Sequence, residues 1–189
     1  MLSNFNGVLN LLKYAKNNNA RRMLYISSSE VYGSKITEDS FEESQFGSID
    51  INSIRSSYSE SKRASEVLCK AYSSEYNVDT VIVRPGHIYG PTASPKDKRV
   101  SSDFSYRAAQ GKVLEMKSLG LQKRSYCYSL DCAAAILIVL INGEKGVSYN
   151  IGHDEVTSIR EMAQIIAEAG NVILKIKEPT EDDLKQLIQ

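Results

Sequence analysis

A tyrosine and a lysine stand four residues apart, as Tyr58 and Lys62, where apolar residues recur at helical spacing. Side chains at positions i and i+4 share one face of a helix, so the ammonium group would lie beside the phenol. A neighbouring positive charge favours the phenolate, and each unit by which the pKa of a tyrosine falls below about 10 requires about 1.4 kcal/mol. Such a pair could take a proton from a hydroxyl group of a substrate. The same spacing also arises by chance on solvated helix faces, so the pattern alone carries little weight.

A run of hydroxyl groups and a carboxylate, Ser27-Ser28-Ser29-Glu30, directly follows the short apolar stretch 23–26. Such a stretch is typical of a buried strand in a parallel sheet, and ligands bind at the carboxyl ends of these strands. The order of strand, hydroxyl groups and helix therefore predicts one catalytic site that also contains Tyr58 and Lys62. Glu30 would lie at its mouth, either as a general acid or base or as an ordinary loop carboxylate.

Strands and helices alternate along the chain, which predicts an α/β fold with a mainly parallel sheet. The periodicity predicts helices over residues 6–16, 59–76, 101–110, 132–141 and 159–169, and strands over residues 23–26, 78–83, 113–117, 124–128, 147–151 and 172–176. Asp131 and Thr157 are the expected N-caps of the last two helices, with Glu161 close enough to add to a capping box, and Gly111 ends the helix 101–110. The long polar loop 34–57 is expected to be functional, and a second loop is expected over residues 89–99.

The composition narrows the class of protein. Lys plus Arg equal Asp plus Glu at 23 each, so the formal net charge is zero, which argues against nucleic-acid binding and a basic membrane-binding surface. The longest apolar run, 132–141, is shorter than the ~20 residues that cross a bilayer, and the first residues show no signal-peptide pattern. The 3 cysteines form no Cys-x-x-Cys pair. We therefore expect reduced, buried thiols, no metal site and a cytoplasmic protein.

From about Asn4 to about Ala169 the chain resembles the extended short-chain dehydrogenases/reductases that act on nucleotide sugars, the NAD-dependent epimerase/dehydratase family. The resemblance rests on the hydroxyl run and the Tyr58/Lys62 segment, and on the stretches 4–7, 84–91, 99–104, 122–126 and 149–152. It implies the second half of a Rossmann-like, NAD-binding parallel sheet over residues 1–90. Residues 91–189 would mainly form a small α/β part that binds the substrate, with some segments returning to the sheet.

The resemblance also implies a role for each candidate residue. The expected catalytic residues are Ser28, Ser29, Glu30, Tyr58 and Lys62. The expected contacts to NAD are Asn4, Ser27, Tyr58, Lys62, Arg84 and Pro85. The expected contacts to a nucleotide-diphosphate sugar, above all a UDP-sugar, are His87, Arg99, Val100 and Arg124. A homodimer is expected of the full-length form.

Some of these assignments have ordinary alternatives. Arg84 could equally end its strand with a surface ion pair. His87 stands where the family often has Asn, so a loop histidine is as well supported as a sugar contact. Arg124 is favoured for the diphosphate because its guanidinium is a rigid bidentate donor.

The reactions of this family share a first step, the oxidation of C4 of the sugar to a 4-keto intermediate. Tyr58 would take the hydroxyl proton while hydride leaves the same carbon for NAD. The 4,6-dehydratases have Asp-Glu after the catalytic hydroxyl residue, and the 4-epimerases have small uncharged residues there. Ser29-Glu30 is instead similar to the UDP-glucuronate decarboxylases, in which the ketone accepts electrons as carbon dioxide leaves. We expect C4 oxidation and reduction, with decarboxylation as the favoured outcome.

The glycine-rich turn that binds pyrophosphate in such sheets is absent, because the sequence contains neither GxGxxG nor GxxGxxG. We therefore expect a fragment, a late-start gene product or one piece of a split gene. Such a chain should bind NAD poorly, and should expose an apolar sheet edge or pair with another chain. A catalytically silent nucleotide-sugar-binding fragment or interaction module is the alternative function. A short-chain dehydrogenase for small alcohols is disfavoured by the long loop after Gly33.

Overall fold

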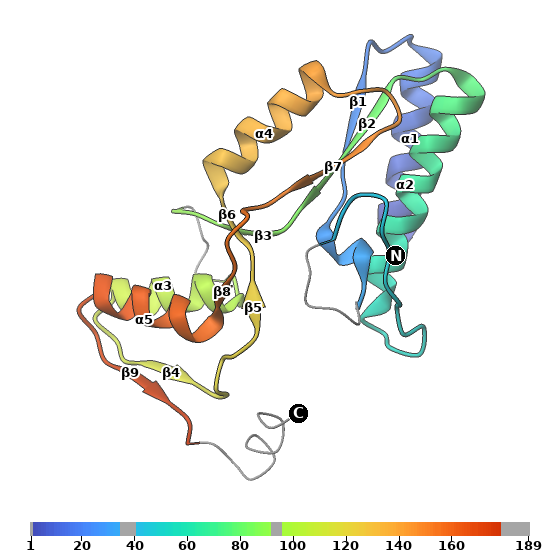
Figure 1. The fold of residues 1–189 in the computed structure, drawn as a ribbon. Coiled ribbons are helices and arrows are strands. Elements are labelled where there is room, and N and C mark those ends of the chain that lie inside the picture. The colour runs from blue at the N-terminus through green and yellow to red at the C-terminus, as the bar shows by residue number, and fades with distance from the viewer. Residues whose placement is uncertain (1, 35–40, 92–95, 179–189) are drawn as a thin grey trace. The chain divides into compact units, whose positions relative to one another are not determined.

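The computed structural model describes residues 2–34, 41–91 and 96–178, and the chain divides into two compact units. The first unit comprises Met1–Ile88 and Ser129–Gly152, and the second comprises Tyr89–Tyr128 and His153–Gln189. The chain therefore leaves the first unit near residue 88 and returns to it for one helix and one strand (Figure 1). From the sequence we predicted the boundary between the two parts at residue 90. That the first part binds NAD and the second mainly binds the substrate stays a prediction.

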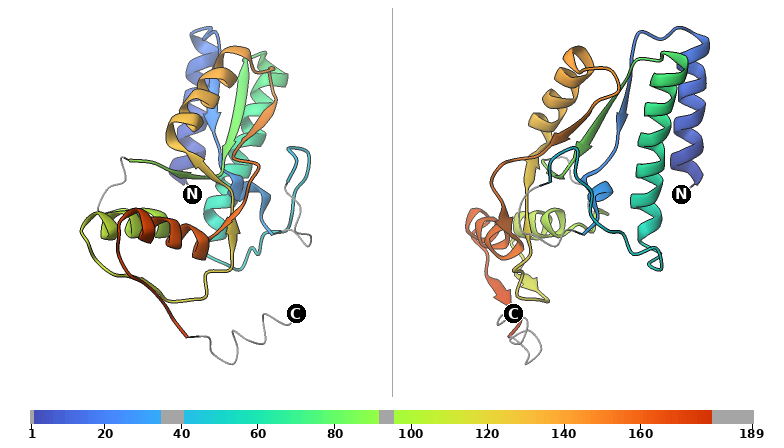
Figure 2. Two further views of the ribbon diagram at one scale, coloured as in Figure 1. Left: turned by 60° about the vertical axis from the view of Figure 1, so that its left-hand side comes forward. Right: turned by 45° about the vertical axis from the view of Figure 1, so that its right-hand side comes forward.

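The first unit is built on a parallel sheet in the order β1-β2-β7, formed by β1 (Met23–Ile26), β2 (Thr80–Pro85) and β7 (Ser148–Ile151). The register pairs Met23 with Thr80 and Ile82 with Ser148. Helices α1 (Leu2–Asn17) and α2 (Ser56–Tyr76) cover one face of the sheet, and α4 (Ser129–Asn142) covers the other (Figure 2). Every residue of β2 is buried, as expected for the central strand of a sheet covered on both faces.

Apolar residues at helical spacing form the core between the sheet and the two helices on its first face. Val8 and Leu12 of α1 pack with Tyr25 and Ile82 of the sheet and with Cys69 of α2. All 3 cysteines are buried, as the sequence predicted.

Arg22, just before β1, holds the carboxyl end of α4. Its guanidinium donates to the carbonyl oxygens of Leu140 and Ile141 at 3.1 and 3.3 Å, and forms an ion pair with Asp79 at 2.9 Å. The last carbonyl groups of a helix have no partners within the helix, and a cation at this end is favourable. Arg22 thereby fixes α4 to the sheet.

The second unit packs α3 (Val100–Ala109) against α5 (Ile159–Ala169). Its strands are β4 (Leu114–Met116), which pairs in parallel with β9 (Leu174–Ile176), and β5 (Lys123–Arg124), which pairs antiparallel with β8 (Thr157–Ser158). The strand β6 (Tyr126–Tyr128) also lies here, and β3 (His87–Tyr89) runs into this unit from the first. The core contains Phe104, Ala108, Leu114, Met116, Met162, Ala163 and Ala167.

All five predicted helices and all six predicted strands form, and the structure corrects their details. The predicted strand 124–128 is divided at Ser125, whose hydroxyl group donates to the carbonyl oxygen of His153 at 2.6 Å and accepts from its amide at 2.8 Å. Ser158, rather than Thr157, is the N-cap of α5, in a capping box with Glu161. Helix α4 begins at Ser129, so Asp131 lies in its first turn and is not the N-cap.

Within the described ranges, every helix falls short of the length and apolarity that crossing a membrane requires. The same ranges contain no group of three or more His, Cys, Asp or Glu residues placed to bind a metal ion.

Candidate active site

The predicted hydroxyl run forms a sharp turn at the carboxyl end of β1. The amide of Ser27 continues the ladder by donating to the carbonyl oxygen of Val83 at 2.8 Å. A short 3-10 helix, η1 (Ser29–Tyr32), then begins, with Ser28 as its N-cap accepting from the amide of Glu30 at 3.2 Å. The helix η1 was not predicted from the sequence. This turn fixes the direction in which the run leaves the sheet.

Gly33 ends η1 in a conformation that only glycine adopts without strain. Its φ is 70°, and a Cβ atom there would lie 2.3 Å from the carbonyl oxygen of Ser48. The polar loop after Gly33 is therefore held directly against the end of η1.

Lys62 lies between the end of β1 and the ring of Tyr58. Its Nζ donates to the carbonyl oxygen of Ile26 at 2.8 Å and is 5.8 Å from the centroid of the Tyr58 ring. Burial lowers the pKa of Lys62, partly offset by the charge of Glu66. Tyr58 is 44% exposed, so its phenol is accessible to a substrate. The structure thus brings Tyr58 and Lys62 to the strand end where the sequence predicted them.

Glu30 faces the first turn of α2, the helix that carries Tyr58. Its carboxylate accepts from Arg55 at 3.3 Å and lies 3.5 Å from the hydroxyl oxygen of Ser59. A carboxylate at a helix N-terminus is stabilised by the helix dipole. Glu30 is therefore oriented by α2, and its half-exposed side chain remains open to a ligand.

The residues expected to contact NAD differ in whether their polar groups already have hydrogen-bond partners within the chain. The hydroxyl group of Ser27 is buried and has no hydrogen-bond partner among the described residues, which marks a group that a ligand could satisfy. The amide of Asn4 donates to Ser61 at 3.0 Å and so joins α1 to α2. Pro85 is buried at the end of β2.

Arg84 forms a buried ion pair, which corrects the alternative of a surface ion pair. Its guanidinium donates to the carboxylate of Glu66 at 2.7, 3.0 and 3.2 Å, and its side chain is 0% exposed. It also donates to the hydroxyl oxygen of Tyr32 at 2.8 Å and to the carbonyl oxygen of Glu43 at 2.9 Å. The guanidinium thus joins β2 to α2, which carries Tyr58 and Lys62, and to η1, which carries Glu30. Arg84 therefore helps to hold these two elements in position.

Several residues that hold the site together were not predicted from the sequence. The hydroxyl group of Tyr32 donates to Asn150 of β7 at 2.6 Å. Arg63 donates to the carbonyl oxygens of Val31 at 2.6 Å and Gly47 at 3.0 Å, which ties η1 and the following loop to α2. Glu66 could have been found, because it follows Lys62 by one helical turn on the same face as Tyr58.

The residues expected to contact the sugar nucleotide are mostly exposed. His87 lies on β3, and Val100 opens α3 with its side chain exposed. Arg99 is the N-cap residue of α3 and pairs with Asp97 at 2.6 Å; its hydrogen bonds hold the pKa of that carboxyl well below the usual range. Arg124 lies on β5 and donates to the carbonyl oxygen of Lys123 at 2.9 Å.

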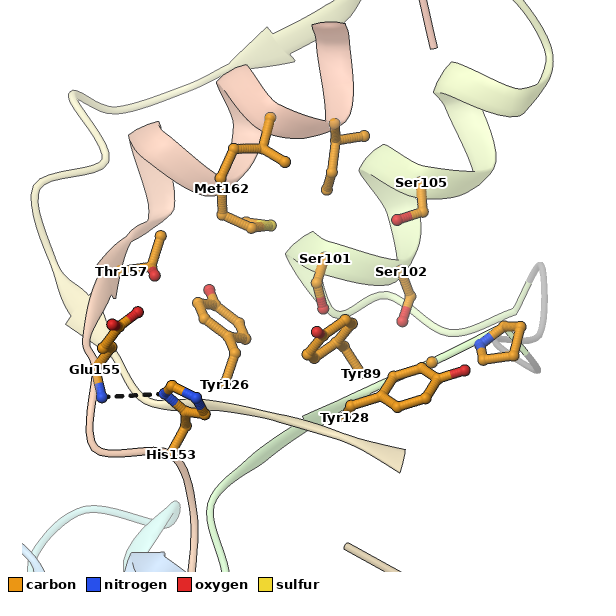
Figure 3. Close-up of a pocket in the computed structure, with 14 residues that line it drawn as sticks. Tyr89, Ser101, Ser102, Ser105, Tyr126, Tyr128, His153, Glu155, Thr157 and Met162 are labelled. Carbon is orange, nitrogen blue, oxygen red and sulfur yellow. Dashed lines mark hydrogen bonds between the residues drawn. The ribbon is translucent and has the colours of Figure 1, made fainter. Parts of the chain in front are cut away.

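The second unit contains a cavity of about 600 Å³ that none of these four residues lines (Figure 3). Its wall contains three tyrosines, of which Tyr89 packs against Tyr126 and Tyr128 with ring centroids 6.4 and 5.6 Å apart. The rest of the wall includes hydroxyl groups of α3 and apolar side chains of α5. Besides the three tyrosines, the lining residues are Gly90, Pro91, Ser101, Ser102, Ser105, His153, Glu155, Thr157, Met162, Ile165 and Ile166. Aromatic walls with a few polar groups are typical of sites for small organic ligands.

Nδ1 of His153 accepts a hydrogen bond from the amide of Glu155 at 3.1 Å, which leaves the Nε2 side of the ring as the donor in the neutral state (Figure 3). Burial raises the pKa of Tyr126, partly offset by the charge of Arg124. The hydroxyl group of Tyr126 is therefore a neutral hydrogen-bonding group near neutral pH.

Solved structures with the same fold come from enzymes of sugar-nucleotide metabolism. A UDP-glucose 4-epimerase with UDP-glucose from Thermotoga maritima aligns with 96% of this chain and 58% of its own, at a TM-score of 0.80 and 21% identity. A dTDP-glucose 4,6-dehydratase in complex with NAD from Bacillus anthracis aligns with 94% of this chain and 56% of its own, at a TM-score of 0.80 and 26% identity. These likenesses support the Rossmann-like fold class.

Curated relatives are similar over nearly the whole chain. UDP-glucuronic acid decarboxylase 3 of Arabidopsis thaliana is 36% identical over 186 residues, which is 97% of this chain and 54% of the relative. UDP-glucuronic acid decarboxylase 1 of Xenopus tropicalis is 32% identical over 93% of this chain and 42% of the relative. This chain spans only about half of the length of the curated relatives that it matches. Residues 1–152 match the profile of the NAD dependent epimerase/dehydratase family, and the chain belongs to that family.

Proposed function

We propose that this chain carries the proton-transfer centre of an NAD-dependent enzyme that oxidises C4 of a nucleotide-diphosphate sugar. The observation that carries the proposal is the position of Lys62, whose amine is held at the end of β1 and beside the Tyr58 ring. An ammonium group at this place favours the phenolate of Tyr58. The family match supports the same chemistry.

In the proposed reaction Tyr58 takes the proton of the C4 hydroxyl group as the C4–O bond becomes a carbonyl. Among the described residues the Ser28 hydroxyl oxygen accepts from the Glu30 amide, and its hydrogen is available to be donated to the C4 oxygen. When bound, NAD would supply the acceptor for the hydride that leaves C4. Lys62 stabilises the phenolate and keeps its ammonium group in place through Ile26.

The residues at the end of β1 fit the nicotinamide end of NAD. Ser27 offers a buried hydroxyl group without a partner among the described residues, and Lys62 offers an ammonium group with further hydrogens to donate. The pyrophosphate requires a glycine-rich turn at a helix N-terminus, which the sequence lacks. We therefore propose that this chain binds NAD weakly by itself.

Decarboxylation of a UDP-uronic acid is the outcome that we propose for the 4-keto intermediate. The C5–carboxylate bond breaks and its electron pair passes to the C4 carbonyl, which becomes an enolate while carbon dioxide leaves. The enolate is then protonated at C5, and reduced NAD, when bound, would return its hydride to C4, so the overall reaction is redox-neutral. Glu30 of η1 faces the first turn of α2 and is the proposed acid for C5. The names of the curated relatives support this outcome.

The base of the nucleotide is proposed to occupy the tyrosine-lined cavity of the second unit. Tyr89 and Tyr126 offer aromatic surface for stacking, and Ser101 and Ser102 offer hydroxyl groups. Tyr126→Ala should weaken UDP binding in isothermal titration at least tenfold. Tyr106→Ala, an exposed tyrosine of α3 that does not line the cavity, is the control. Equal loss in both variants would contradict this placement.

The catalytic proposal is tested with UDP-glucuronate and millimolar NAD by measuring carbon dioxide release and absorbance of reduced NAD. We expect slow activity that Tyr58→Phe and Lys62→Met each reduce at least a hundredfold. Tyr14→Phe, an exposed tyrosine on α1, should leave the rate unchanged. Isothermal titration with NAD should show only weak binding, and a micromolar dissociation constant would refute that part of the proposal.

A catalytically silent fragment that binds nucleotide sugars, or an interaction module, is the second candidate. Two observations favour it: the sequence lacks a glycine-rich turn, and the cavity is lined by residues of the second unit alone. Binding of a UDP-sugar without carbon dioxide release or NAD reduction would support this candidate. A homodimer of the full-length form and a cytoplasmic location stay predictions.

A further inference from the structure

Two aromatic rings flank the ammonium group of Lys62. The Nζ atom lies over the ring of Tyr25 at 5.0 Å from its centroid, and 5.8 Å from the centroid of the Tyr58 ring. A cation within about 6 Å of the centre of an aromatic face is attracted by the negative charge density of that face. Tyr58 is the proposed proton acceptor, whereas Tyr25 has no part in the proposed reaction. The contact with Tyr25 therefore requires a separate explanation.

The ring of Tyr25 is a fixed part of the core. It is 7% exposed and packs in one cluster with Val8 and Leu12 of α1 and Cys69 of α2. In the register of β1 and β2 its residue pairs with Ile82, which is fully buried. Contacts from two helices and the neighbouring strand hold the ring in one orientation, because protein interiors are closely packed.

Helix α2 presents one face to this ring. Lys62, Glu66 and Cys69 follow one another at spacings of four and three residues, so they lie on the same side of the helix. The ammonium group of Lys62 donates to the carbonyl oxygen of Ile26, the residue after Tyr25, at 2.8 Å. One backbone hydrogen bond and one ring face thus define the position of the ammonium group on the β1 side.

The ammonium group has little other charge compensation. Burial lowers the pKa of Lys62, and the charge of Glu66 only partly offsets this effect. The Glu66 carboxylate accepts three hydrogen bonds from Arg84 at 2.7 to 3.2 Å, so most of its charge is balanced by that guanidinium. The ion pairs among the described residues do not include Lys62. The titratable side chains around Lys62 are Tyr25 of β1, Tyr58, Glu66 and Cys69 of α2 and, through Glu66, Arg84 of β2.

The hydroxyl group of Tyr25 does not account for the contact. It is buried and has no hydrogen-bond partner among the described residues. Burial raises the pKa of Tyr25, so the phenol is neutral where Lys62 is charged and the two do not form an ion pair. A buried hydroxyl group without a partner costs free energy. The ring is therefore the part of Tyr25 that acts on Lys62.

We infer that Tyr25 is a positioning residue of the candidate site, whose ring face holds the Lys62 ammonium group in its charged form beside Tyr58. The consequence for catalysis rests on the proposed function, because it matters only if Tyr58 and Lys62 transfer the proton. The contact between the ring and the ammonium group does not depend on that function. It can be measured without NAD or substrate.

The experiment measures the pKa of Lys62 by NMR in the 189-residue chain, isotope-labelled at the ε-carbon of lysine, and Lys62→Met assigns the resonance. Tyr25→Leu removes the ring. We expect this variant to lower the pKa of Lys62 by about 0.5 to 1 pH unit, because the charged form loses its attraction to the ring face. Tyr25→Phe keeps the ring and should leave the pKa within about 0.2 pH unit of the parent value.

A second substitution changes the charge of the ring face while keeping its shape. Pentafluorophenylalanine introduced at position 25 has a face that no longer attracts a cation, because the fluorine atoms withdraw electron density. It should lower the pKa of Lys62 as much as Tyr25→Leu does. This variant decides the question if circular dichroism shows that Tyr25→Leu does not fold.

Leu12→Ala is the control for lost packing. Leu12 is fully buried in the same cluster, so its truncation should destabilise the first unit and leave the pKa of Lys62 unchanged. The inference is overturned if the pKa of Lys62 does not respond to the loss or fluorination of the ring. It is equally overturned if Tyr25→Phe or Leu12→Ala lowers this pKa as much as Tyr25→Leu does.

The pH dependence of the rate of carbon dioxide release from UDP-glucuronate tests the consequence for catalysis. Its alkaline limb should move to lower pH in Tyr25→Leu by the same amount as the pKa of Lys62, and should stay in place in Tyr25→Phe. A parent chain without activity would contradict the proposed function, whereas the NMR titration would still decide whether Tyr25 acts on Lys62.

Discussion

Removing the charge of Glu66 should destabilise the first unit more than any change at an exposed ion pair. Glu66→Gln keeps the shape of the side chain but takes the counter-charge from Arg84. The two side chains are 6% and 0% exposed, and three donor–acceptor distances of 2.7 to 3.2 Å join them. The guanidinium would then remain buried with only neutral acceptors, which are the new amide oxygen at position 66, the hydroxyl oxygen of Tyr32 and the carbonyl oxygen of Glu43.

Breaking a buried ion pair by removing one partner costs about 3–5 kcal/mol, because an uncompensated charge is left in the interior. A typical domain is stable by about 5–15 kcal/mol, so roughly a fifth or more of the free energy of unfolding is at stake. With a urea m-value of about 2 kcal/mol/M, the unfolding midpoint should fall by about 2 M.

The assay is urea unfolding followed by circular dichroism. The control is Glu60→Gln, since Glu60 and Arg63 form a partly exposed pair 3.7 Å apart that should be worth less than about 1 kcal/mol. The double variant Glu66→Met with Arg84→Met should be more stable than Glu66→Gln, because no lone buried charge remains. A loss below about 1 kcal/mol in Glu66→Gln, or a double variant less stable than it, would refute the reasoning.

Three other predictions concern single residues. Burial raises the pKa of Cys69 to about 12, so its alkylation at pH 8 should be roughly a thousandfold slower in the folded chain than in urea, as measured by mass spectrometry. Ser158→Ala removes the N-cap of α5 and should cost about 1 kcal/mol in urea unfolding. Burial lowers the pKa of Lys62 in the folded state. Between that pKa and about 10.4, the unfolded state therefore binds more protons than the folded state, so the free energy of unfolding should rise with pH across this window. The rise in unfolding free energy from pH 8 to pH 10 should be smaller in Lys62→Met.

The secondary structure could be predicted because each element has a local signal. The strand 23–26 was placed correctly at both ends, because an apolar run meets polar residues on each side. Helix α5 was equally clear from its periodicity, but its N-cap was placed one residue early because Thr157 and Ser158 are both good caps. Local patterns locate elements well and assign single capping residues less well.

The interactions that hold the candidate site could not be predicted, because their partners are far apart in the sequence. Arg84 and Glu66 are 18 residues apart, and Tyr32 and Asn150 are 118 apart. No spacing rule relates such pairs before the sheet order β1-β2-β7 is known. The tyrosine-lined cavity was missed for the same reason, since it gathers residues from 89 to 166.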